Sequence, residues 1–379
     1  MRILVAPDKF KDSLGAAAVA EQIAAGVREV FPRAEIIQLP LADGGEGTAA
    51  VICAAAGGEW QTCDADDARG RPIVARYCTI DGGEIAIMEM SEAAGRWREP
   101  ENGRDPVAAS SSGVGKMLLE AARRGAREIV IGLGGSATND GGFGLARALG
   151  FRFLDENGVE LAGDVLGLLR LREIRPGPRV LPRITAAADV RNPLLGDRGA
   201  TRTFGAQKGA TVAQTELLEA ALKNLADVCA EDFGKDFRET PGAGAAGGLG
   251  FGLLSFCSAE MRSGFEVVAE RIGLEEAIQN ADLVITGEGR LDGQTREGKA
   301  PAGVARLARR YGKQVCAIVG SADDSVNAHE LFDAVVVLAR PPVSVAESIS
   351  CAPELLRARA AELARGDAWR PRHTSTPRS

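Results

Sequence analysis

The chain has 379 residues, of which 45% are hydrophobic and 26% charged, and its formal net charge is −7 at pH 7. This composition is typical of a globular protein, while the negative charge and an aromatic content of only 4% argue against nucleic-acid binding. No apolar run approaches the length of a membrane-spanning helix, and the N-terminal apolar run is too short for a signal peptide. Seven scattered cysteines without a C-x-x-C pair favour reduced thiols, so we expect a cytoplasmic protein.

The N-terminal part predicts alternating strands and helices. Residues 3–6 form a short apolar run typical of a buried strand, and a polar turn follows it. Ser13 in that turn is a predicted N-cap for a helix whose apolar face runs through residues 20–30. Residues 36–39 predict a second strand, which leads through an acidic, glycine-rich turn to a helix that begins at Thr48.

The middle of the chain has a different pattern. Residues 61–90 contain short alternating segments typical of antiparallel strands, so a second domain is predicted to begin near residue 76. Ile129-Val130-Ile131 predicts a central buried strand that enters the glycine-rich stretch 132–144. A further strand is expected at residues 184–187, directly before Asp189.

The alternation of strands and helices in the N-terminal part returns in the last third of the chain. Strands are predicted at residues 283–286, 315–319 and 334–339, and a closing helix is predicted through Leu355 and Leu363. The fold class is therefore α/β with two α/β domains. A discontinuous, Rossmann-like parallel-sheet domain is expected from residues 1–76 and 283–367, and a second, mixed α/β domain is inserted at 77–282. The polar tail 368–379 is predicted to be frayed.

The stretch 132–144 is the strongest local signal in the chain. Its glycines are interleaved with Ser136, Thr138, Asn139 and Asp140, so polar side chains stand within a bare backbone. A strand that ends in such a turn is typical of a loop whose backbone N–H groups surround an anion or a metal-bound ligand. The alternative is a tight turn with a polar surface, which we consider the weaker interpretation.

Acidic residues recur where predicted strands end. Because the carboxyl ends of parallel strands form ligand sites, these acids are expected to gather, and Mg²⁺ bound to a phosphate substrate would relieve their mutual repulsion. The alternative is that some of them cap helix N-termini. The chain has only two histidines, so carboxylates or lysines are expected to carry any proton transfer. The acids are Asp8, Asp43, Glu46, Asp140, Asp189, Glu288, Asp292 and Asp323.

Two glycine motifs need weighing against known patterns. The segment Ser112-Gly-Val-Gly-Lys-Met117 is not a Walker A loop, because no strand precedes it and Met117 replaces the magnesium-binding hydroxyl residue. Gly132-x-Gly134-x-x-Ala137 does follow a strand, and Asp155 lies near the distance of a ribose-binding acid. An NAD-dependent hydroxy-acid dehydrogenase is therefore a rival interpretation, although no helix starts at once after the loop and no suitably placed histidine exists.

Three lysines lie beside glycines or polar turns. Lys299 precedes Pro301, which is expected in the first turn of a helix, and a bound phosphate would explain a cation there. Lys9 follows the first strand directly. Lys208, taken singly, is predicted to be a solvated surface charge.

Six segments spread over nearly the whole chain carry a specific pattern. They are Ala6-Pro-Asp-Lys-Phe-Lys-Asp-Ser13, Pro40-Leu-Ala-Asp-Gly-Gly-Glu-Gly-Thr48, Gly132-Leu-Gly-Gly-Ser-Ala-Thr-Asn-Asp-Gly-Gly142, Gln207-Lys-Gly-Ala210, Gly242-Ala-Gly-Ala-Ala-Gly-Gly248 and Asp282-Leu-Val-Ile-Thr-Gly-Glu-Gly289 with Gly298-Lys299. Read together, in this order and spacing, they resemble the bacterial class I glycerate kinases. Departures are small: Ala187-Ala188 precede Asp189 where a cysteine neighbour is expected, and the C-terminal tail is specific to this chain.

The resemblance implies transfer of the γ-phosphoryl group of ATP to D-glycerate, commonly giving 2-phosphoglycerate, in a cleft between two α/β domains. ATP and Mg²⁺ are the expected cofactors; the small-molecule substrate and nucleotide are the expected partners, without nucleic acid or membrane, and a homodimer is left open. A glycerate 2-kinase needs positioning, cations and a carboxylate base, and it needs no histidine. Besides the dehydrogenase, a non-catalytic sugar-acid-binding protein is the alternative.

Residue roles follow as hypotheses. Asp189, Asp8 and Lys9 are the predicted catalytic residues, with Asp189 as the base or a metal ligand. Asp43, Glu46, Ser13, Asn192 and Lys299 are predicted to bind the substrate. The predicted nucleotide-binding residues are Gly134, Gly135, Ser136, Thr138, Asn139, Gly244, Gly247 and Gly248, and the predicted metal ligands are Asp189, Asp140, Glu288 and Asp292.

Overall fold

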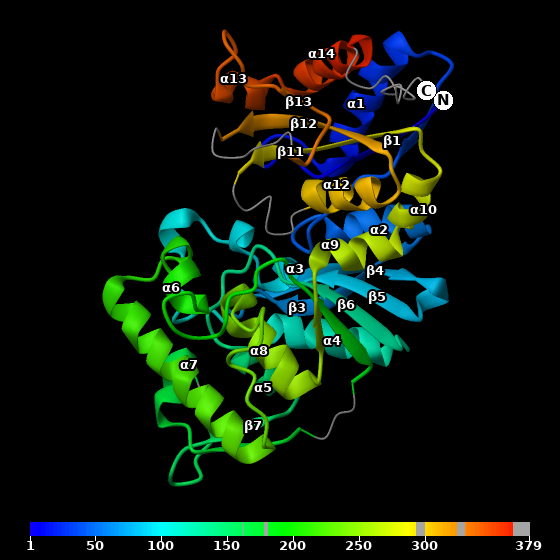
Figure 1. Cartoon of the computed structure of the whole chain (residues 1–379). Helices are drawn as coiled ribbons and strands as arrows, with labels where there is room; N and C mark the ends of the chain where they lie inside the picture. The colour runs from blue at the N-terminus through cyan, green and yellow to red at the C-terminus, as the bar shows by residue number, and fades with distance from the viewer. Residues whose placement is uncertain (162, 178–180, 293–299, 324–329, 367–379) are drawn as a thin grey trace, which may run out of the picture. The chain divides into compact units, whose positions relative to one another are not determined.

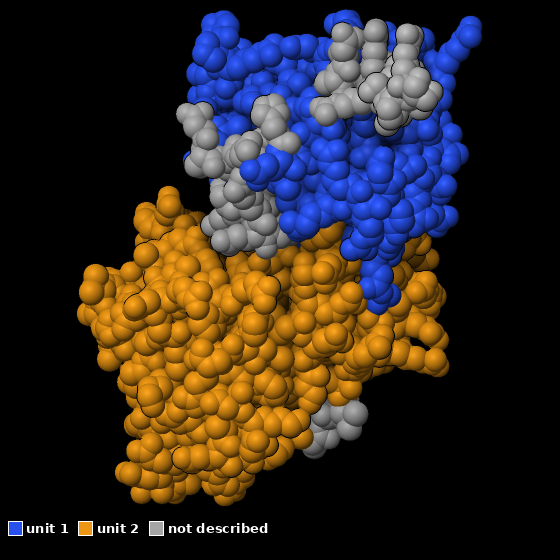
Figure 2. Space-filling view, in the orientation of Figure 1, with its two compact units in different colours: residues 1–43, 268–379 blue, residues 44–267 orange. Residues whose placement is uncertain are grey.

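The computed structural model describes residues 1–161, 163–177, 181–292, 300–323 and 330–366 (Figure 1). The chain forms two compact units, coloured separately in Figure 2. Unit 1 comprises residues 1–43 and 268–379, and unit 2 comprises residues 44–267. Among the described residues, no helix combines the length and apolarity needed to cross a membrane.

Unit 1 contains a five-stranded sheet in the order β13-β12-β11-β1-β2, and every neighbouring pair is parallel. The middle strands are continuous apolar runs because both faces of the sheet are covered: Ile3, Leu4, Val5 and Ala6 are all fully buried. The strands are β1 Arg2–Pro7, β2 Glu35–Gln38, β11 Leu283–Leu291, β12 Gln314–Ala322 and β13 Ala334–Val337.

Helices cover both faces of this sheet (Figure 1). On one face α1 and α14 pack together, and Ile23 and Leu356 join the core that includes Val5 and Ile285. The two helices approach closely, since a side chain at Gly26 would meet the Arg357 carbonyl oxygen at 2.1 Å. The opposite face carries α12. The helices are α1 Ala16–Val30, α10 Leu274–Gln279, α12 Ala300–Arg310, α13 Val345–Ser350 and α14 Ala352–Arg365, and α9 Gly264–Arg271 spans the unit boundary.

Unit 2 contains a mixed six-stranded sheet in the order β10-β9-β6-β5-β4-β3. Strands β10, β9, β6 and β5 are mutually parallel, and β4 and β3 add to the edge of β5 in antiparallel fashion. A separate antiparallel pair is formed by β7 and β8. The strands are β3 Glu59–Asp66, β4 Pro72–Ile80, β5 Ile85–Glu89, β6 Glu128–Gly132, β7 Arg152–Leu154, β8 Glu173–Arg175, β9 Arg183–Ala187 and β10 Glu260–Arg262.

Two hydrophobic clusters hold unit 2 together. One joins the sheet to α4 and α8, with Val114 and Leu249 beside Ile131. The other lies under α7 and is rich in phenylalanine, for example Phe143 edge-on to Phe153 with ring centroids 4.8 Å apart. The helices are α2 Thr48–Ala56, α3 Ser91–Ala94, α4 Ser112–Arg123, α5 Phe143–Ala148, α6 Ala200–Phe204, α7 Val212–Phe233 and α8 Ala245–Cys257.

The α/β fold class is as predicted, but the boundaries and some element ends differ. The predicted boundary near residue 76 moves to residue 43, because α2 packs on β4 and β5 and so belongs to unit 2. The predicted boundary at residue 283 moves to 268, because α10 packs against α12. Ser13 is not an N-cap: α1 is capped by Gly15, and the Ser13 hydroxyl donates to the Ile349 carbonyl oxygen at 2.9 Å.

All seven cysteines are free thiols, and only Cys351, at the start of α14, is exposed. Burial raises the pKa of Cys63 to about 11 and the pKa values of Cys257 and Cys316 to about 12. The buried thiols behave as small apolar side chains in the two units.

Candidate active site

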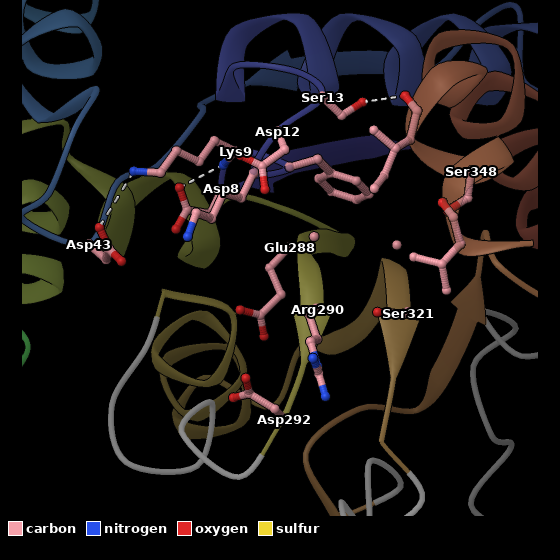
Figure 3. A pocket seen from close by; sticks show the side chains of 16 residues that line it. Asp8, Lys9, Asp12, Ser13, Asp43, Glu288, Arg290, Asp292, Ser321 and Ser348 are labelled. Carbon is pink, nitrogen blue, oxygen red and sulfur yellow. Dashed lines mark hydrogen bonds and ion pairs between the residues drawn. The ribbon is translucent and has the colours of Figure 1, made fainter. Parts of the chain in front are cut away.

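Unit 1 has a pocket of about 530 Å³ where β1, β11 and β12 end. Residues directly after β1 form one wall, and the ends of β11 and β12 with helix α13 form the others (Figure 3). This is the edge of a parallel sheet at which ligands bind. The predicted site residues that line the pocket are Asp8, Lys9, Ser13, Asp43, Glu288 and Asp292.

The pocket holds cations and carboxylates close together. Asp8 is only 7% exposed, and its carboxylate accepts a hydrogen bond from the backbone N–H of Lys9 at 2.6 Å. The Lys9 ammonium lies 3.9 Å from the Asp43 carboxylate (Figure 3). Lys9 therefore stands between two acids and offers positive charge at the edge of the sheet.

Strand β11 ends at Leu291 and is therefore longer than the predicted strand at residues 283–286. Glu288 lies inside the strand, and Glu288, Arg290 and Asp292 all line the pocket. Their spacing of two residues puts them on one face of an extended chain. The sequence analysis missed Arg290, whose guanidinium bonds both Asp323 oxygens at 3.0 and 3.1 Å; the same two-residue period could have found it.

The four predicted metal ligands are divided between the two units. Within the described ranges, no group of three or more His, Cys, Asp or Glu side chains is close enough to hold a metal ion. Glu288 and Asp292 belong to unit 1, whereas Asp140 and Asp189 belong to unit 2. Mg²⁺ commonly binds one or two carboxylates, substrate phosphates and water, so the acids of the pocket in unit 1 fit such an ion without a complete cage.

The second group of predicted residues lies at one edge of the sheet of unit 2. Strands β5, β6 and β9 are parallel neighbours, so the residues that follow them share this edge. Here Gly44 and Gly45 pack directly on the backbone after β6: a side chain at Gly134 would lie 2.4 Å from the Gly45 Cα. Glycine is required at this contact because there is no room for a Cβ.

The exposed part of the loop after β6 is held by its neighbours. Gly135 has φ +69° and is exposed, and its carbonyl oxygen accepts a hydrogen bond from the backbone N–H of Arg96 at 2.8 Å. Ser136 is only 5% exposed, and the N–H of Ala137 donates to the Ala94 carbonyl oxygen at 2.8 Å. Gly134 and Gly135 are therefore the most exposed residues of the loop, whereas Ser136 is buried.

The following residues are buried. Thr138 and Asn139 are fully buried, and Asp140 is 2% exposed. The Asp140 carboxylate accepts four hydrogen bonds, from the N–H and hydroxyl of Ser111 and from the N–H groups of Gly142 and Gly144, at 2.8 to 3.1 Å. Burial raises the pKa of Asp140, and these hydrogen bonds oppose the rise. Its metal-binding role stays a prediction, while its observed bonds fix the loop and the start of α5.

The glycines at the start of α8 are packed against the same loop. Gly247 and Gly248 have φ values of +70° and +86°, and side chains there would meet the Thr138 carbonyl oxygen at 2.0 Å and the Gly141 Cα at 2.9 Å. A side chain at Gly244 would meet the Pro193 carbonyl oxygen at 2.1 Å. Close backbone packing already requires these three glycines, so their nucleotide-binding role stays a prediction.

Three further predicted residues lie beyond the strand ends of unit 2. Asp189 follows β9, and its carboxylate accepts hydrogen bonds from the Ser263 hydroxyl and the Phe265 N–H, both at 3.3 Å. The Asn192 side chain donates to the Arg198 carbonyl oxygen at 2.7 Å. Glu46 is exposed. The sequence analysis missed Glu89, which accepts from the N–H groups of Gly47 and Ala49 at 3.0 and 2.9 Å and so caps α2.

The predictions for two lysines have different outcomes. Lys208 is not a surface charge: it is 3% exposed, and its ammonium donates to the Thr138 carbonyl oxygen at 2.7 Å. Burial lowers the pKa of Lys208 to about 7; Arg96 contributes to this lowering and Asp140 opposes it. Lys299 lies outside the described residues.

Comparison with known proteins shows the family of the chain. The model of the glycerate kinase family matches residues 3–366. The chain is 43% identical over 330 residues to the glycerate 2-kinase of Escherichia coli (strain K12), covering 86% of this chain and 87% of that protein. It is 42% identical over 340 residues to the glycerate kinase of Bacillus subtilis (strain 168), with 86% and 87% covered.

A crystal structure from Salmonella typhimurium LT2, described as a glycerate kinase 2, superposes with a TM-score of 0.83 at 40% identity and covers 96% of this chain and 97% of that one. The α/β fold and the charged pocket thus belong to an enzyme, a kinase of small molecules. The chain belongs to the glycerate kinase family.

Proposed function

We propose that this kinase transfers the γ-phosphoryl group of ATP to D-glycerate and gives 2-phosphoglycerate and ADP. The observation that carries the proposal is the pocket of unit 1, in which Lys9 and the acids Asp8, Glu288 and Asp292 meet where parallel strands end. A cation and carboxylates able to hold Mg²⁺ are what phosphoryl transfer requires of a protein. The names of the relatives support glycerate as the substrate.

Mg²⁺ would be held by one or two carboxylates, for which Glu288 and Asp292 of this pocket remain our proposal together with Asp140 and Asp189 of unit 2, and it would neutralise charge on the transferred group. Lys9 would attract the glycerate carboxylate or the developing phosphate charge. Asp43, Glu46, Ser13 and Asn192 remain the proposed contacts to glycerate. The Ser13 and Asn192 side chains are engaged in hydrogen bonds to backbone carbonyls, so their substrate role requires those bonds to be exchanged.

In unit 2, the backbone N–H groups of Gly134, Gly135 and Ser136 would bind nucleotide phosphates, because Gly134 and Gly135 are the most exposed residues of this loop and its neighbours hold it in place. Asp189 is our proposal for the base that accepts the hydroxyl proton of glycerate. No histidine lies in either group of residues, in line with carboxylate-based proton transfer.

A coupled assay of ADP release with D-glycerate, with and without Mg²⁺, tests the proposal. We expect ADP release that requires both glycerate and Mg²⁺, and chromatography of the product should give 2-phosphoglycerate. A change in nicotinamide absorbance without ATP use would instead indicate a dehydrogenase. Binding of glycerate without nucleotide consumption would indicate a sugar-acid-binding protein. The seven free thiols support our further proposal of a cytoplasmic location.

A further inference from the structure

Lys208 is a cation in the interior of unit 2. It ends a short 3₁₀ turn, Ala206–Lys208, and is 3% exposed. The described chain gives its ammonium one hydrogen-bond acceptor, the carbonyl oxygen of Thr138 at 2.7 Å. Burying an ammonium costs far more free energy than burying an apolar side chain of the same length, so packing alone does not account for this residue.

The residue bonded to Lys208 belongs to the loop that follows β6. The Thr138 carbonyl lies between Lys208 and Gly247, where any side chain would approach that oxygen to 2.0 Å. The next residue is held from the same segment, because the Asn139 amide donates to the Thr201 hydroxyl at 2.9 Å. Residues 200–208 therefore hold two successive positions of the loop.

Besides the close packing of Gly247, the hydrogen bond from Lys208 is the polar contact that orients the peptide between Thr138 and Asn139. The Thr138 hydroxyl and the Asn139 side-chain oxygen are buried and have no hydrogen-bond partner in the described parts of the chain. Three positions before Thr138, Gly135 has φ +69° and no Cβ to restrict its backbone, so contacts from neighbouring residues must keep it in one conformation. The Lys208 side chain donates to the Thr138 carbonyl at 2.7 Å and fixes the direction of that carbonyl.

We propose that Lys208 is a positioning residue, which holds the Thr138 carbonyl and thereby keeps the N–H groups of Gly134–Ser136 aimed at the nucleotide phosphates. This inference rests on the proposed function, because it assigns a purpose to the loop only if that loop binds ATP. A second link supports it: the Arg96 guanidinium bonds the Gln207 side chain at 3.0 Å while the Arg96 N–H bonds the Gly135 carbonyl oxygen at 2.8 Å. The segment that carries Lys208 is thus tied to both ends of the loop.

The test compares Lys208→Met with Lys223→Met. Methionine fills nearly the same space without charge or N–H groups. Lys223 is a matched control on α7, since its side chain is 63% exposed and pairs with Asp227. We expect Lys208→Met to raise KM for ATP at least tenfold while KM for glycerate changes less than twofold, and Lys223→Met to behave as the wild type.

The outcomes separate positioning from a structural role. If Lys208→Met lowers kcat only in proportion to the folded fraction, with both KM values unchanged, the proposal is wrong. Lys208→Gln keeps an N–H donor and should show a smaller rise in KM for ATP. Failure of both variants to fold would also overturn the proposal, since the residue would then serve the fold.

Isothermal titration calorimetry of ATP binding needs no glycerate, so it keeps the two proposals distinguishable. Weaker ATP binding in Lys208→Met supports positioning even if the substrate is not glycerate. Equal ATP binding in variant and wild type, with normal glycerate phosphorylation by both, leaves the proposed function standing and refutes the role of Lys208.

Discussion

Replacing Lys208 by methionine should change how the stability of unit 2 depends on pH. Burial lowers the pKa of Lys208 from the ordinary 10.5 to about 7, because the charged form loses its hydration. The unfolded chain therefore binds more protons than the folded chain between pH 7 and 10.5. In that window the free energy of unfolding of the wild type rises with pH, and below pH 7 the burial of the charge costs its full amount.

The magnitude follows from the two pKa values. Each pH unit between them corresponds to about 1.4 kcal/mol, so the buried charge costs about 5 kcal/mol below pH 7 and about 2 kcal/mol at pH 9. The variant escapes this cost but leaves the Thr138 carbonyl without its donor, which costs about 1–3 kcal/mol. Lys208→Met should thus be more stable than the wild type at pH 6, by about 2–4 kcal/mol, and should lose about 3 kcal/mol of that advantage by pH 9.

Urea unfolding at pH 6, 7.5 and 9 measures the difference between variant and wild type, which cancels the titration of all other groups. Tryptophan fluorescence reports unit 2 selectively in a Trp369→Phe background, because Trp60 and Trp97 both lie in that unit. Lys223→Met should show a flat difference across the same range. A flat difference for Lys208→Met, or a variant less stable than the wild type at pH 6, would refute the assignment of a buried cation. Greater stability with weaker activity is the pattern expected of a residue kept for function.

Three further outcomes are expected. Asp189→Asn should remove most turnover while circular dichroism stays that of the wild type, and near-normal turnover would eliminate Asp189 as the base. Gly134→Ala should destabilise unit 2 by about 1–3 kcal/mol in urea unfolding, because the new Cβ lies 2.4 Å from the Gly45 backbone. Gly15→Ala is its control, with open space around the position, and equal effects of the two would contradict the packing reasoning. Glu288→Gln should raise the Mg²⁺ concentration needed for half-maximal activity, and an unchanged Mg²⁺ titration would exclude Glu288 as a ligand.

The parallel strands of both units could be predicted because a strand that is buried on both faces has a continuous run of apolar residues. Residues 3–6 and the Ile129-Val130-Ile131 run are examples, and each became the middle of a sheet. The end of β11 could not be predicted in the same way. Glycines and charged residues from Gly287 onward look like a turn in sequence, yet they continue the strand because their backbone pairs with β12 as far as Leu291 and Ala322.

The glycines of the site show a different limit. A missing Cβ allows a ligand to approach the backbone, and it equally allows another stretch of backbone to do so. Gly135 is exposed and can serve the first purpose, whereas Gly247 and Gly248 face the loop after β6 and serve the second. A glycine that contacts a ligand and a glycine that contacts another backbone segment look the same in the sequence, so only the packed structure distinguishes them.

Lys208 shows that charge in a sequence does not reveal burial. A lysine beside a glycine is usually solvated, and the signal that could have changed the prediction was its place in a segment matching the family. The acids Asp8, Asp43, Glu288 and Asp292 could be grouped from the sequence because they lie near the ends of strands of one parallel sheet, where topology alone brings them to one edge.

The distribution of thiols in the chain has a practical use. Because the other six cysteines are at least partly buried and Cys351 is exposed, a maleimide dye should attach to the native protein at that one position without mutagenesis. Cys351 is two residues from Ile349, which lines the pocket of unit 1. A fluorophore there would give an optical signal of pocket occupancy, and ligand titrations could then be followed independently of catalytic turnover.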